Sequence, residues 1–225
     1  MKKGNMYEFA VTWNPLGGEC SHKCSYCSTN SLKKRYAAVK FKYEGEPRFY
    51  PSKPPKPKDG QVVFVCAQND LFAENVPDTI IMQLLELTNT KENTYFFQTK
   101  NPSKVLSYID FLPQKSIICT TIETNRVYPQ MGNTPSPTNR IVSINFLSSH
   151  VGVDTQVTIE PIMDFDLEEF VSLLKGCNVT QVNIGADSKN NNLPEPSKEK
   201  VLSLISELEK FTNVHLKSNL QRLIK

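Results

Sequence analysis

The stretch Cys20-Ser-His-Lys-Cys24-Ser-Tyr-Cys27 places three thiols within eight residues, in the spacing C-x3-C-x2-C. A run that alternates β-branched and aromatic residues, 7–13, comes before it, and turn residues over 14–18 separate the two. Cys thiolates hold iron–sulfur clusters, and one short loop can bring several of them to the same cluster. Three close cysteines with no obvious fourth therefore predict a four-iron cluster with one iron open to another ligand.

Two other uses of these cysteines fit the sequence less well. A structural zinc site takes four ligands, usually in paired Cys and His groups. His22 lies too close to the cysteines for such a pair, and His150 and His215 have no cysteine beside them. A disulfide framework fits poorly in a chain of this size that begins with no signal-peptide pattern. The cluster is the favoured hypothesis, and a zinc-containing nucleic-acid-binding module stays open as the alternative.

Length and composition indicate one α/β domain over residues 1–225. The sequence holds no run of 18 apolar residues, so we expect no transmembrane helix and no membrane partner. Six cysteines in a chain without a secretion signal fit the reducing cytoplasm. The net charge of +3 is too small to predict nucleic-acid binding by itself.

Strand-like and helix-like segments alternate along the chain. The strands are expected at 7–13, 61–65, 95–99, 116–122, 156–162, 180–184 and 214–217. Helices are expected from Pro77, at 102–111, at 141–147, from Asp166 to Leu174, and after Ser197, with a Pro-, Asn- and Thr-rich loop over 129–139. Asp166 and Glu169 have the spacing of a capping box, and Gly176 is a candidate C-cap. This alternation predicts a parallel sheet, and its six or so units fit a partial, TIM-like (β/α)6 barrel.

One segment, 31–58, departs from this pattern and looks like an insertion. It has nine Lys and Arg residues against two Glu residues, with aromatic residues interleaved, and it ends in a Pro-rich connector over 51–58. Basic and aromatic residues together favour phosphate binding and base stacking. A solvated surface excursion over the cysteine loop is the other interpretation.

The cysteine loop, with Tyr26 before its last cysteine, resembles the signature of the radical S-adenosylmethionine (SAM) superfamily. The resemblance implies that Cys20, Cys24 and Cys27 bind a [4Fe-4S] cluster and that SAM chelates its fourth iron. Reduction then cleaves SAM to a 5′-deoxyadenosyl radical that abstracts hydrogen from a substrate, and a flavodoxin or ferredoxin is the expected electron donor. The superfamily's fold is the same partial barrel.

The resemblance extends over nearly the whole chain. The elements TWNPLGG, VFVCAQNDLF, YFFQTKNP, TTIETN and TIEPI, in this order, resemble a family of mostly uncharacterised radical SAM-like proteins of phages and bacteria. Two motifs depart from the superfamily. Ala67-Gln68-Asn69-Asp70 stands where many members carry Gly-Gly-Glu, and only Ile159-Glu160-Pro161 stands where a glycine-rich adenine motif is common.

Polar residues at the carboxyl ends of barrel strands are candidates for the site. The expected cofactor-binding residues are Gln68 or Asp70 for the SAM ammonium group, Lys100 or Arg126 for its carboxylate, and Glu123 and Glu160 for its ribose hydroxyls or ammonium. Lys217 is expected to face the substrate. Cys119 shares a strand face with Glu123, because side chains alternate along a strand. Resemblance to a radical SAM lesion-repair enzyme implies that Cys119 or Cys66 is a candidate hydrogen-atom donor to a substrate radical. Cys177 is expected to be a small buried hydrophobe.

Several functions remain open at this point. The first is a radical SAM enzyme with an unknown substrate, for which the basic segment weakly favours nucleic acid or a nucleotide. A radical SAM lyase that repairs pyrimidine lesions is the alternative within that class. The others are the zinc module and a cluster-bearing scaffold that does not use SAM. The same signature serves hydrogen abstraction, methyl transfer and rearrangement, so it does not choose the reaction.

Overall fold

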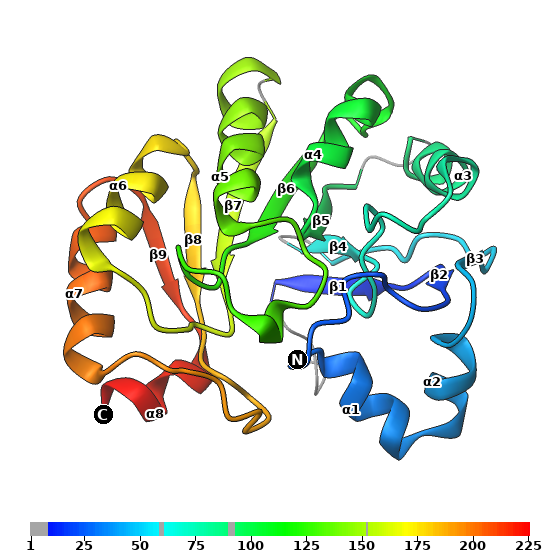
Figure 1. The fold of residues 1–225 in the computed structure, drawn as a ribbon. Coiled ribbons are helices and arrows are strands. Elements are labelled where there is room, and N and C mark those ends of the chain that lie inside the picture. Colours follow the sequence, from blue (N-terminus) through cyan, green and yellow to red (C-terminus); the bar gives the residue numbers. More distant parts are fainter. Residues whose placement is uncertain (1–8, 59–60, 90–92, 152) are drawn as a thin grey trace.

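The computed structural model describes residues 9–58, 61–89, 93–151 and 153–225. Seven strands form one sheet in the order β1-β4-β5-β6-β7-β8-β9, and every neighbouring pair is parallel. They are β1 Ala10–Trp13, β4 Val62–Val65, β5 Tyr95–Thr99, β6 Ser116–Thr121, β7 Asp154–Ile159, β8 Gln181–Ile184 and β9 Asn213–Leu216. The sheet curves into a half-barrel with helices along its outer side (Figure 1). This confirms the predicted α/β partial barrel.

The connecting helices follow the strands in βαβ fashion. They are α3 Asp78–Thr88, α4 Pro102–Val105, α5 Pro137–Phe146, α6 Leu167–Gly176, α7 Lys198–Leu208 and α8 Gln221–Ile224. Short 3-10 helices lie at η1 Leu106–Phe111, η2 Pro129–Met131 and η4 Ser218–Leu220, and a π-helical turn, η3 Leu147–Val151, extends α5. No helix in the described part of the chain is long and apolar enough to span a bilayer.

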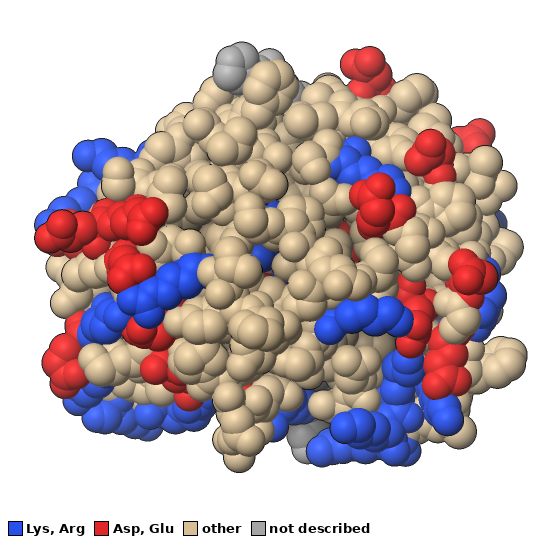
Figure 2. Space-filling view, in the orientation of Figure 1, with Lys and Arg blue, Asp and Glu red and all other residues tan. Residues whose placement is uncertain are grey.

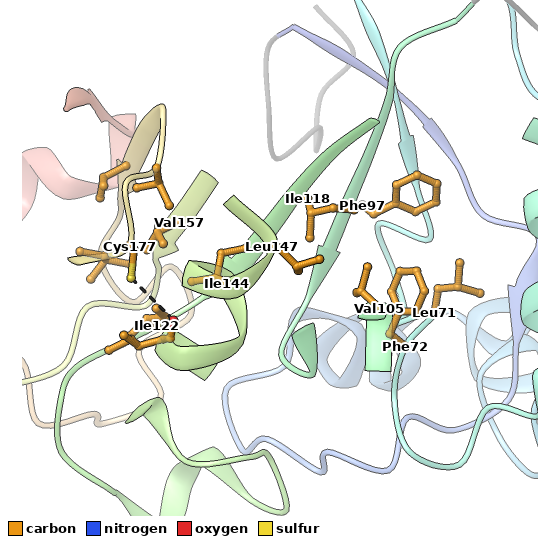
Figure 3. Packing of buried hydrophobic residues seen from close by; sticks show 14 of the residues in the cluster. Leu71, Phe72, Phe97, Val105, Ile118, Ile122, Ile144, Leu147, Val157 and Cys177 are labelled. Atoms are coloured by element: carbon orange, nitrogen blue, oxygen red, sulfur yellow. Dashed lines mark hydrogen bonds between the residues drawn. The ribbon is translucent and has the colours of Figure 1, made fainter. Parts of the chain in front are cut away.

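The main core lies between the sheet and the outer helices. Alternate residues of the strands, such as Phe97 and Ile118, point outward and meet apolar residues of the helices (Figure 3). Phe72 packs edge-on against Phe97, with ring centroids 6.1 Å apart. Cys177 is fully buried in this cluster and its Sγ donates to the Leu173 carbonyl at 3.4 Å, as expected for a small core residue. The apolar surface buried between the sheet and the helices stabilises the curved sheet.

Segment 31–58 is more ordered than its composition predicted. It contributes to α1 Ser28–Arg35, forms α2 Ala37–Lys42, and supplies β3 Arg48–Phe49, which pairs antiparallel with β2 Leu16–Gly17. The positive φ of Gly18, at 87°, lets the chain turn there against the backbone of Glu46, where any Cβ would overlap. The segment is therefore anchored on the strand pair that leads into the cysteine loop.

Helix α6 begins after Asp166 as predicted, but the predicted capping box does not form and the helix ends later than expected. Asp166 makes no capping hydrogen bond, because Arg126 Nε donates to its Oδ2 at 2.8 Å, and Glu169 instead accepts from Asn125 at 2.7 Å. A charge-assisted tertiary bond replaces the local cap. Helix α6 runs through Gly176, and Asn178, with φ 48°, takes the left-handed position.

Other boundaries shift by a few residues. Helix α5 begins inside the predicted loop, at Pro137, because Ser136 caps it by accepting from the Asn139 N–H at 3.2 Å. Strand β7 ends before the cis Glu160–Pro161 bond, since proline has no N–H to donate to a ladder. The start of the first predicted strand, 7–8, lies outside the described residues.

We expect Phe72→Ala to lower the free energy of unfolding by about 3–5 kcal/mol, because it removes a fully buried ring and leaves a cavity beside Phe97. Phe111→Ala is the matched control, since Phe111 is 45% exposed and should cost about 1 kcal/mol or less. Urea unfolding under reducing conditions, followed by circular dichroism, measures both. Equal losses in the two variants would contradict this description of the core.

Candidate functional site

The cysteine loop lies at the carboxyl edge of the sheet, between β2 and α1. Cys24 is buried, with 5% of its surface exposed, and Cys20 and Cys27 are half-buried. Cys27 is the N-cap residue of α1, directly before its first residue, Ser28. Because β1 runs directly toward this loop, the parallel topology delivers all three thiols to the edge at which the other strands also end.

Two neighbouring segments hold the loop from opposite sides. On one side the His22 ring nitrogen Nε2 lies 2.8 Å from Asp70 Oδ2. On the other, the Asn133 N–H donates to the His22 carbonyl at 2.7 Å and the Ser25 N–H donates to the Gln130 carbonyl at 2.9 Å. Gly132 presses so closely on the His22 carbonyl that a Cβ would overlap it. The loop is therefore fixed before any ligand binds.

The electrostatics of the thiols suit ligation of a polynuclear cation. Burial is the largest cause that raises the pKa of Cys20 and of Cys24, and the negative charge of the neighbouring thiolates raises both pKa values further. Lys100 acts in the other direction on Cys24 by favouring its thiolate. Binding of a metal cation offsets the burial and the neighbouring negative charge that disfavour these thiolates.

Among the described residues, no group of three or more His, Cys, Asp or Glu side chains is placed to hold one metal ion. In a four-iron cluster each cysteine binds a different iron, so the thiols need to surround the cluster rather than meet at one point. Cys20, Cys24 and Cys27 lie on one short loop and are the residues that would hold such a cluster.

Glu123 forms a buried polar centre beside the loop. Its carboxylate accepts from the Tyr26 hydroxyl at 2.5 Å and from Arg140 at 2.8 Å, and it forms an ion pair with Lys100. The Lys100 ammonium also lies 5.1 Å from the centroid of the Tyr26 ring. Burial by itself would raise the pKa of Glu123, but the positive charges of Lys100 and Arg140 outweigh it and hold that pKa well below its usual range.

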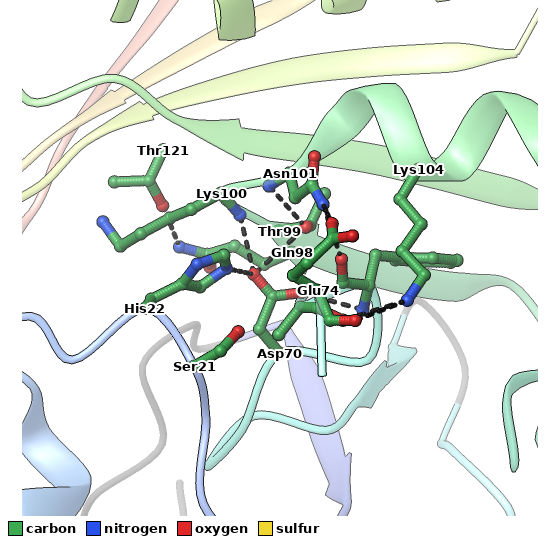
Figure 4. A network of polar contacts seen from close by, with 12 residues as sticks. Ser21, His22, Asp70, Glu74, Gln98, Thr99, Lys100, Asn101, Lys104 and Thr121 are labelled. Carbon is green, nitrogen blue, oxygen red and sulfur yellow. Dashed lines mark hydrogen bonds and ion pairs between the residues drawn. The ribbon is translucent and has the colours of Figure 1, made fainter. Parts of the chain in front are cut away.

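Asp70 is a second buried carboxylate, and its oxygens are occupied by protein donors (Figure 4). Besides His22, it accepts from the N–H of Phe72 at 3.0 Å, the Thr99 hydroxyl at 3.1 Å and the Lys100 N–H at 2.8 Å. Burial opposes its charge, yet His22 and these donors lower its pKa. Asp70 therefore braces the cysteine loop against the end of β5. Gln68 contributes its backbone, whose carbonyl accepts from the Thr29 hydroxyl at 2.8 Å.

Glu160 and Lys217 form a third polar group at the ends of β7 and β9. They are joined by an ion pair, and Asn219 donates to Glu160 Oε1 at 2.7 Å. Gly185, just past β8, leaves room for this carboxylate, because a Cβ there would lie 2.7 Å from Glu160 Oε1. The group spans three neighbouring strands at the same edge as the cysteines.

Arg126 lies apart from these groups. It forms ion pairs with Asp164 and Asp166 near the start of α6, and its side chain is 37% exposed. The structure thus brings Lys100 and Glu123 next to the cysteine loop, places Glu160 with Lys217 further along the edge, and holds Arg126 among acidic partners.

Three contributors were not recognised as site residues in the sequence. His22 looked like an isolated histidine, Arg140 lay at the edge of an apolar helix, and Asn219 followed the last strand. Arg140 is fully buried in α5, where an arginine needs a carboxylate partner. An arginine directly before the apolar run from Ile141 was the one available signal, but its partner Glu123 is known only from the fold.

Segment 31–58 divides into a structural part and an exposed part. Tyr43 is buried, and the Lys42 ammonium lies 5.2 Å from the centroid of the Tyr50 ring, so these aromatic residues pack inward. The exposed basic and aromatic residues of α1, α2 and the junction between them are Lys34, Arg35, Tyr36, Lys40 and Phe41, which we call the α1–α2 corner. Figure 2 shows Lys and Arg gathered at the lower edge of the molecule, over α1.

A separate open cavity of about 550 Å³ borders the outer side of the cysteine loop. Its lining includes His22, Asn101, Asn133, Asn139 and Ser143, and it contains none of the three cysteines and neither Glu123 nor Glu160. We therefore place the candidate site at the cysteines and at the edge groups around them, rather than in this cavity.

Solved structures with a similar fold are radical SAM enzymes. SuiB from Streptococcus suis, bound to its precursor peptide SuiA, has a TM-score of 0.61 at 10% identity, covering 93% of this chain and 49% of SuiB. A variant of spore photoproduct lyase with bound AdoMet and dinucleoside spore photoproduct has a TM-score of 0.62 at 13% identity, covering 92% and 75%. The chain therefore spans about half the length of SuiB. At these identities the likeness establishes the shared fold.

No curated protein matches the sequence. A family model described as "Protein of unknown function (DUF5131)" matches residues 6–162, from the strand before the cysteine loop through the end of β7. The occurrence of relatives in phages stays a prediction. Because that match covers more than half of the 225 residues, the chain belongs to the DUF5131 family.

Proposed function

We propose that this chain is a radical SAM enzyme, in which Cys20, Cys24 and Cys27 bind three irons of a [4Fe-4S] cluster and SAM binds the fourth. The observation that carries the proposal is a braced loop with three closely spaced cysteines at the carboxyl edge of a partial barrel. The shared fold of SuiB and spore photoproduct lyase supports it.

When bound and reduced, the cluster and SAM supply a 5′-deoxyadenosyl radical that takes a hydrogen atom from a substrate. The chain's own residues position and enclose these groups. His22 and the 130–133 segment fix the loop, and Tyr26 ties it to Glu123. A ligand at this edge is therefore held by an arrangement that needs little reorganisation on binding.

The charged groups around the loop suit the amino-acid part of SAM. Lys100 is the cation next to Cys24, which makes it our candidate for the SAM carboxylate, and Glu160 is our candidate for its ribose hydroxyls or ammonium. Lys217, paired with Glu160, is proposed to face the substrate. Arg126 is the weaker candidate for the carboxylate, because two aspartates already neutralise it.

Cys119 lies on the concave face of the sheet, packed with Phe64 and Phe96. That position suits a hydrogen-atom donor to a substrate held inside the half-barrel. Cys66 lies at the end of β4, where burial raises the pKa of its thiol to about 12 and keeps it protonated at neutral pH. We keep Cys119 as the candidate donor, because it faces the interior and Cys66 packs with the outer core.

A nucleotide or nucleic acid is our proposed substrate class, supported by the basic and aromatic α1–α2 corner. Repair of a pyrimidine lesion is the second candidate, because spore photoproduct lyase, which has this fold, has been solved with a dinucleoside spore photoproduct. A flavodoxin or ferredoxin in the cytoplasm is the proposed electron donor, and residues 1–225 are proposed to act as one domain.

After anaerobic reconstitution with iron and sulfide, reduction and addition of SAM, we expect the protein to form 5′-deoxyadenosine. Cys24→Ala should lower the product below detection and reduce the bound iron, because one thiolate ligand is lost. Cys177→Ala is the matched control: it removes a core thiol away from the loop and should keep both cluster and product.

Iron content, absorbance near 400 nm and chromatography of the product provide the readouts. An intact cluster that yields no 5′-deoxyadenosine would contradict the radical SAM proposal and leave the scaffold function. A colourless protein with one zinc ion per chain would support the zinc module instead.

We expect Glu123→Gln to lower the free energy of unfolding by about 3–5 kcal/mol at pH 7, because Lys100 and Arg140 lose their shared counter-charge in a buried site. The exposed Glu46→Gln is the control and should change stability by about 0.5 kcal/mol or less. Urea unfolding of both variants at pH 7 measures the difference.

The pH dependence of the same two variants gives an independent check. The folded-state pKa of Glu123 lies below its usual value of 4.5, so its stabilisation is complete above about pH 4.5 and is lost as the pH falls below it. Wild type and Glu46→Gln should therefore lose stability more steeply on acidification from pH 6 to pH 3 than Glu123→Gln. If stability fell equally with pH in all three proteins, the Glu123 carboxylate would not be the group whose charge stabilises the fold.

A further inference from the structure

Two aromatic side chains of the α1–α2 corner lie in solvent. Phe41 has 76% of its surface exposed and Tyr36 has 56%, and Phe41 is the most exposed large hydrophobic residue in the described part of the chain. Helix α2 carries Phe41, has Tyr36 as its N-cap and contributes no buried residue to the core. Apolar side chains scattered singly over a surface are common. Core packing, however, does not explain why one helix of six residues carries two exposed rings.

Arg48 holds the chain at Phe41. Its Nη2 donates to the Phe41 carbonyl at 2.6 Å, and its Nη1 donates to the Glu44 carbonyl at 2.9 Å. The guanidinium carbon lies 5.9 Å from the centroid of the Phe41 ring. Arg48 belongs to β3, which pairs with β2, so the end of α2 is tied to the strand pair that leads into the cysteine loop. A ring on a backbone that is fixed in this way loses little conformational entropy when a flat group stacks on it.

Each of the two rings directly follows a cation in the sequence, Arg35 or Lys40. Lys34 and Arg35 form no ion pair with any described residue, and Lys40 reaches only Glu44, at 3.9 Å, where both side chains are exposed. Exposed pairs of this kind contribute little to stability. The helix dipole favours cations in the last turn of α1, but it gives no reason for the exposed rings beside them. The positive charge of the corner is therefore available to a partner.

Available cations beside exposed rings match a polyanion that also carries flat apolar groups. Lys and Arg bind phosphates, and aromatic side chains stack on bases whose faces are exposed, as they are in a single strand and are not in a duplex. An acidic peptide would use the cations and leave the rings in water. A membrane surface takes up an amphipathic helix along its length, whereas α2 has only six residues. A single-stranded nucleic acid uses both features of the corner.

The corner lies one helix away from the cysteine loop. Cys27 is the N-cap of α1, and α1 has eight residues, so about 12 Å of helix separates the loop from the corner. Figure 1 shows α1 and α2 at the lower right, outside the curve of the sheet. A strand that lies on the corner can therefore extend toward the carboxyl edge, where one of its nucleotides would meet the charged groups around the cysteines.

We propose that the α1–α2 corner binds a single-stranded nucleic acid. Phe41 and Tyr36 stack on its bases, and the three cations of the corner contact its phosphates. This assignment deepens the proposed function, on which it rests for the reaction, because it makes the substrate a nucleotide within a strand and not a free nucleotide. The binding itself does not depend on the radical chemistry, so the two are measured separately.

The test uses the anaerobically reconstituted full chain and fluorescein-labelled oligo(dT), with binding followed by fluorescence anisotropy over a range of salt concentrations. Phe41→Ala should weaken binding about tenfold and leave the salt dependence unchanged, because it removes a stacking ring and no phosphate contact. The double variant Lys34→Ala/Arg35→Ala should reduce the slope of log Kd against log salt by about 1.4, because each phosphate contact to a single strand contributes about 0.7. The two features of the corner are thereby measured independently.

Phe111→Ala and Lys210→Ala are the matched controls. Both side chains are exposed and lie outside the corner, Phe111 in η1 and Lys210 after the end of α7, so affinity and salt dependence should stay as in wild type. All the substituted residues are exposed, so circular dichroism should be the same for every variant. A duplex of the same length should bind more weakly than the single strand. Oligo(U) is titrated in parallel, and the tighter of the two strands identifies DNA or RNA as the preferred partner.

Three results would overturn the assignment: strand binding that Phe41→Ala leaves unchanged, a duplex that binds as tightly as the single strand, or no strand binding at low salt. Poly-glutamate or phosphatidylserine vesicles that bind more tightly than the strand, and lose affinity in the corner variants, would replace it with an acidic protein or a membrane partner.

The outcomes also separate this proposal from the one on which it rests. If 5′-deoxyadenosine forms but no strand binds, the corner assignment fails and the radical SAM function stands. If a strand binds with the expected sensitivity to both sets of variants but no 5′-deoxyadenosine forms, the corner assignment stands and the radical chemistry fails.

Discussion

Glu123 holds the cysteine loop and the barrel together. Its carboxylate accepts hydrogen bonds from the Tyr26 hydroxyl in the loop and from the Arg140 guanidinium in α5, and it forms an ion pair with the Lys100 ammonium, which follows β5. A buried carboxylate is tolerated only when its charge is compensated, and here two cations share that role. Because the three partners come from separate parts of the chain, the charge balance is complete only when these parts are correctly assembled.

Asp70 is a second buried carboxylate that holds the cysteine loop through partners from separate parts of the chain. It connects His22 with the Thr99 hydroxyl at the end of β5 and with the N–H of the next residue, Lys100, so two buried carboxylates brace the cysteine loop. An arrangement that is rigid before cofactor binding loses little conformational entropy when the cofactor arrives. These tertiary hydrogen bonds distinguish the cysteine loop from an irregular surface connection.

Apolar, neutral polar and charged side chains lie in different parts of the half-barrel. Outward residues such as Phe97 and Ile118 bury apolar surface under the helices, and inward residues such as Thr158 and Asn183 present amides and hydroxyls. Charged residues lie beyond the strand ends, nearest to solvent, where desolvation costs least. Outward apolar and inward polar residues are kept apart because successive side chains of a strand point to opposite faces of the sheet. The charged residues are kept apart from both because they follow the last residue of each strand.

The sequence alone determined the α/β class, the alternation of strands and helices, and the position of the three cysteines after the first strand, because these depend on local periodicity and spacing. Local patterns misled where a distant partner was stronger. Arg126 binds Asp166, which therefore makes no capping hydrogen bond, and the basic segment buries Tyr43. Only the tertiary structure joined Glu123 to Arg140, and His22 to Asp70. Such pairs form between elements that are remote in sequence, and burial makes them strong, so neither partner carries a local signal of the other.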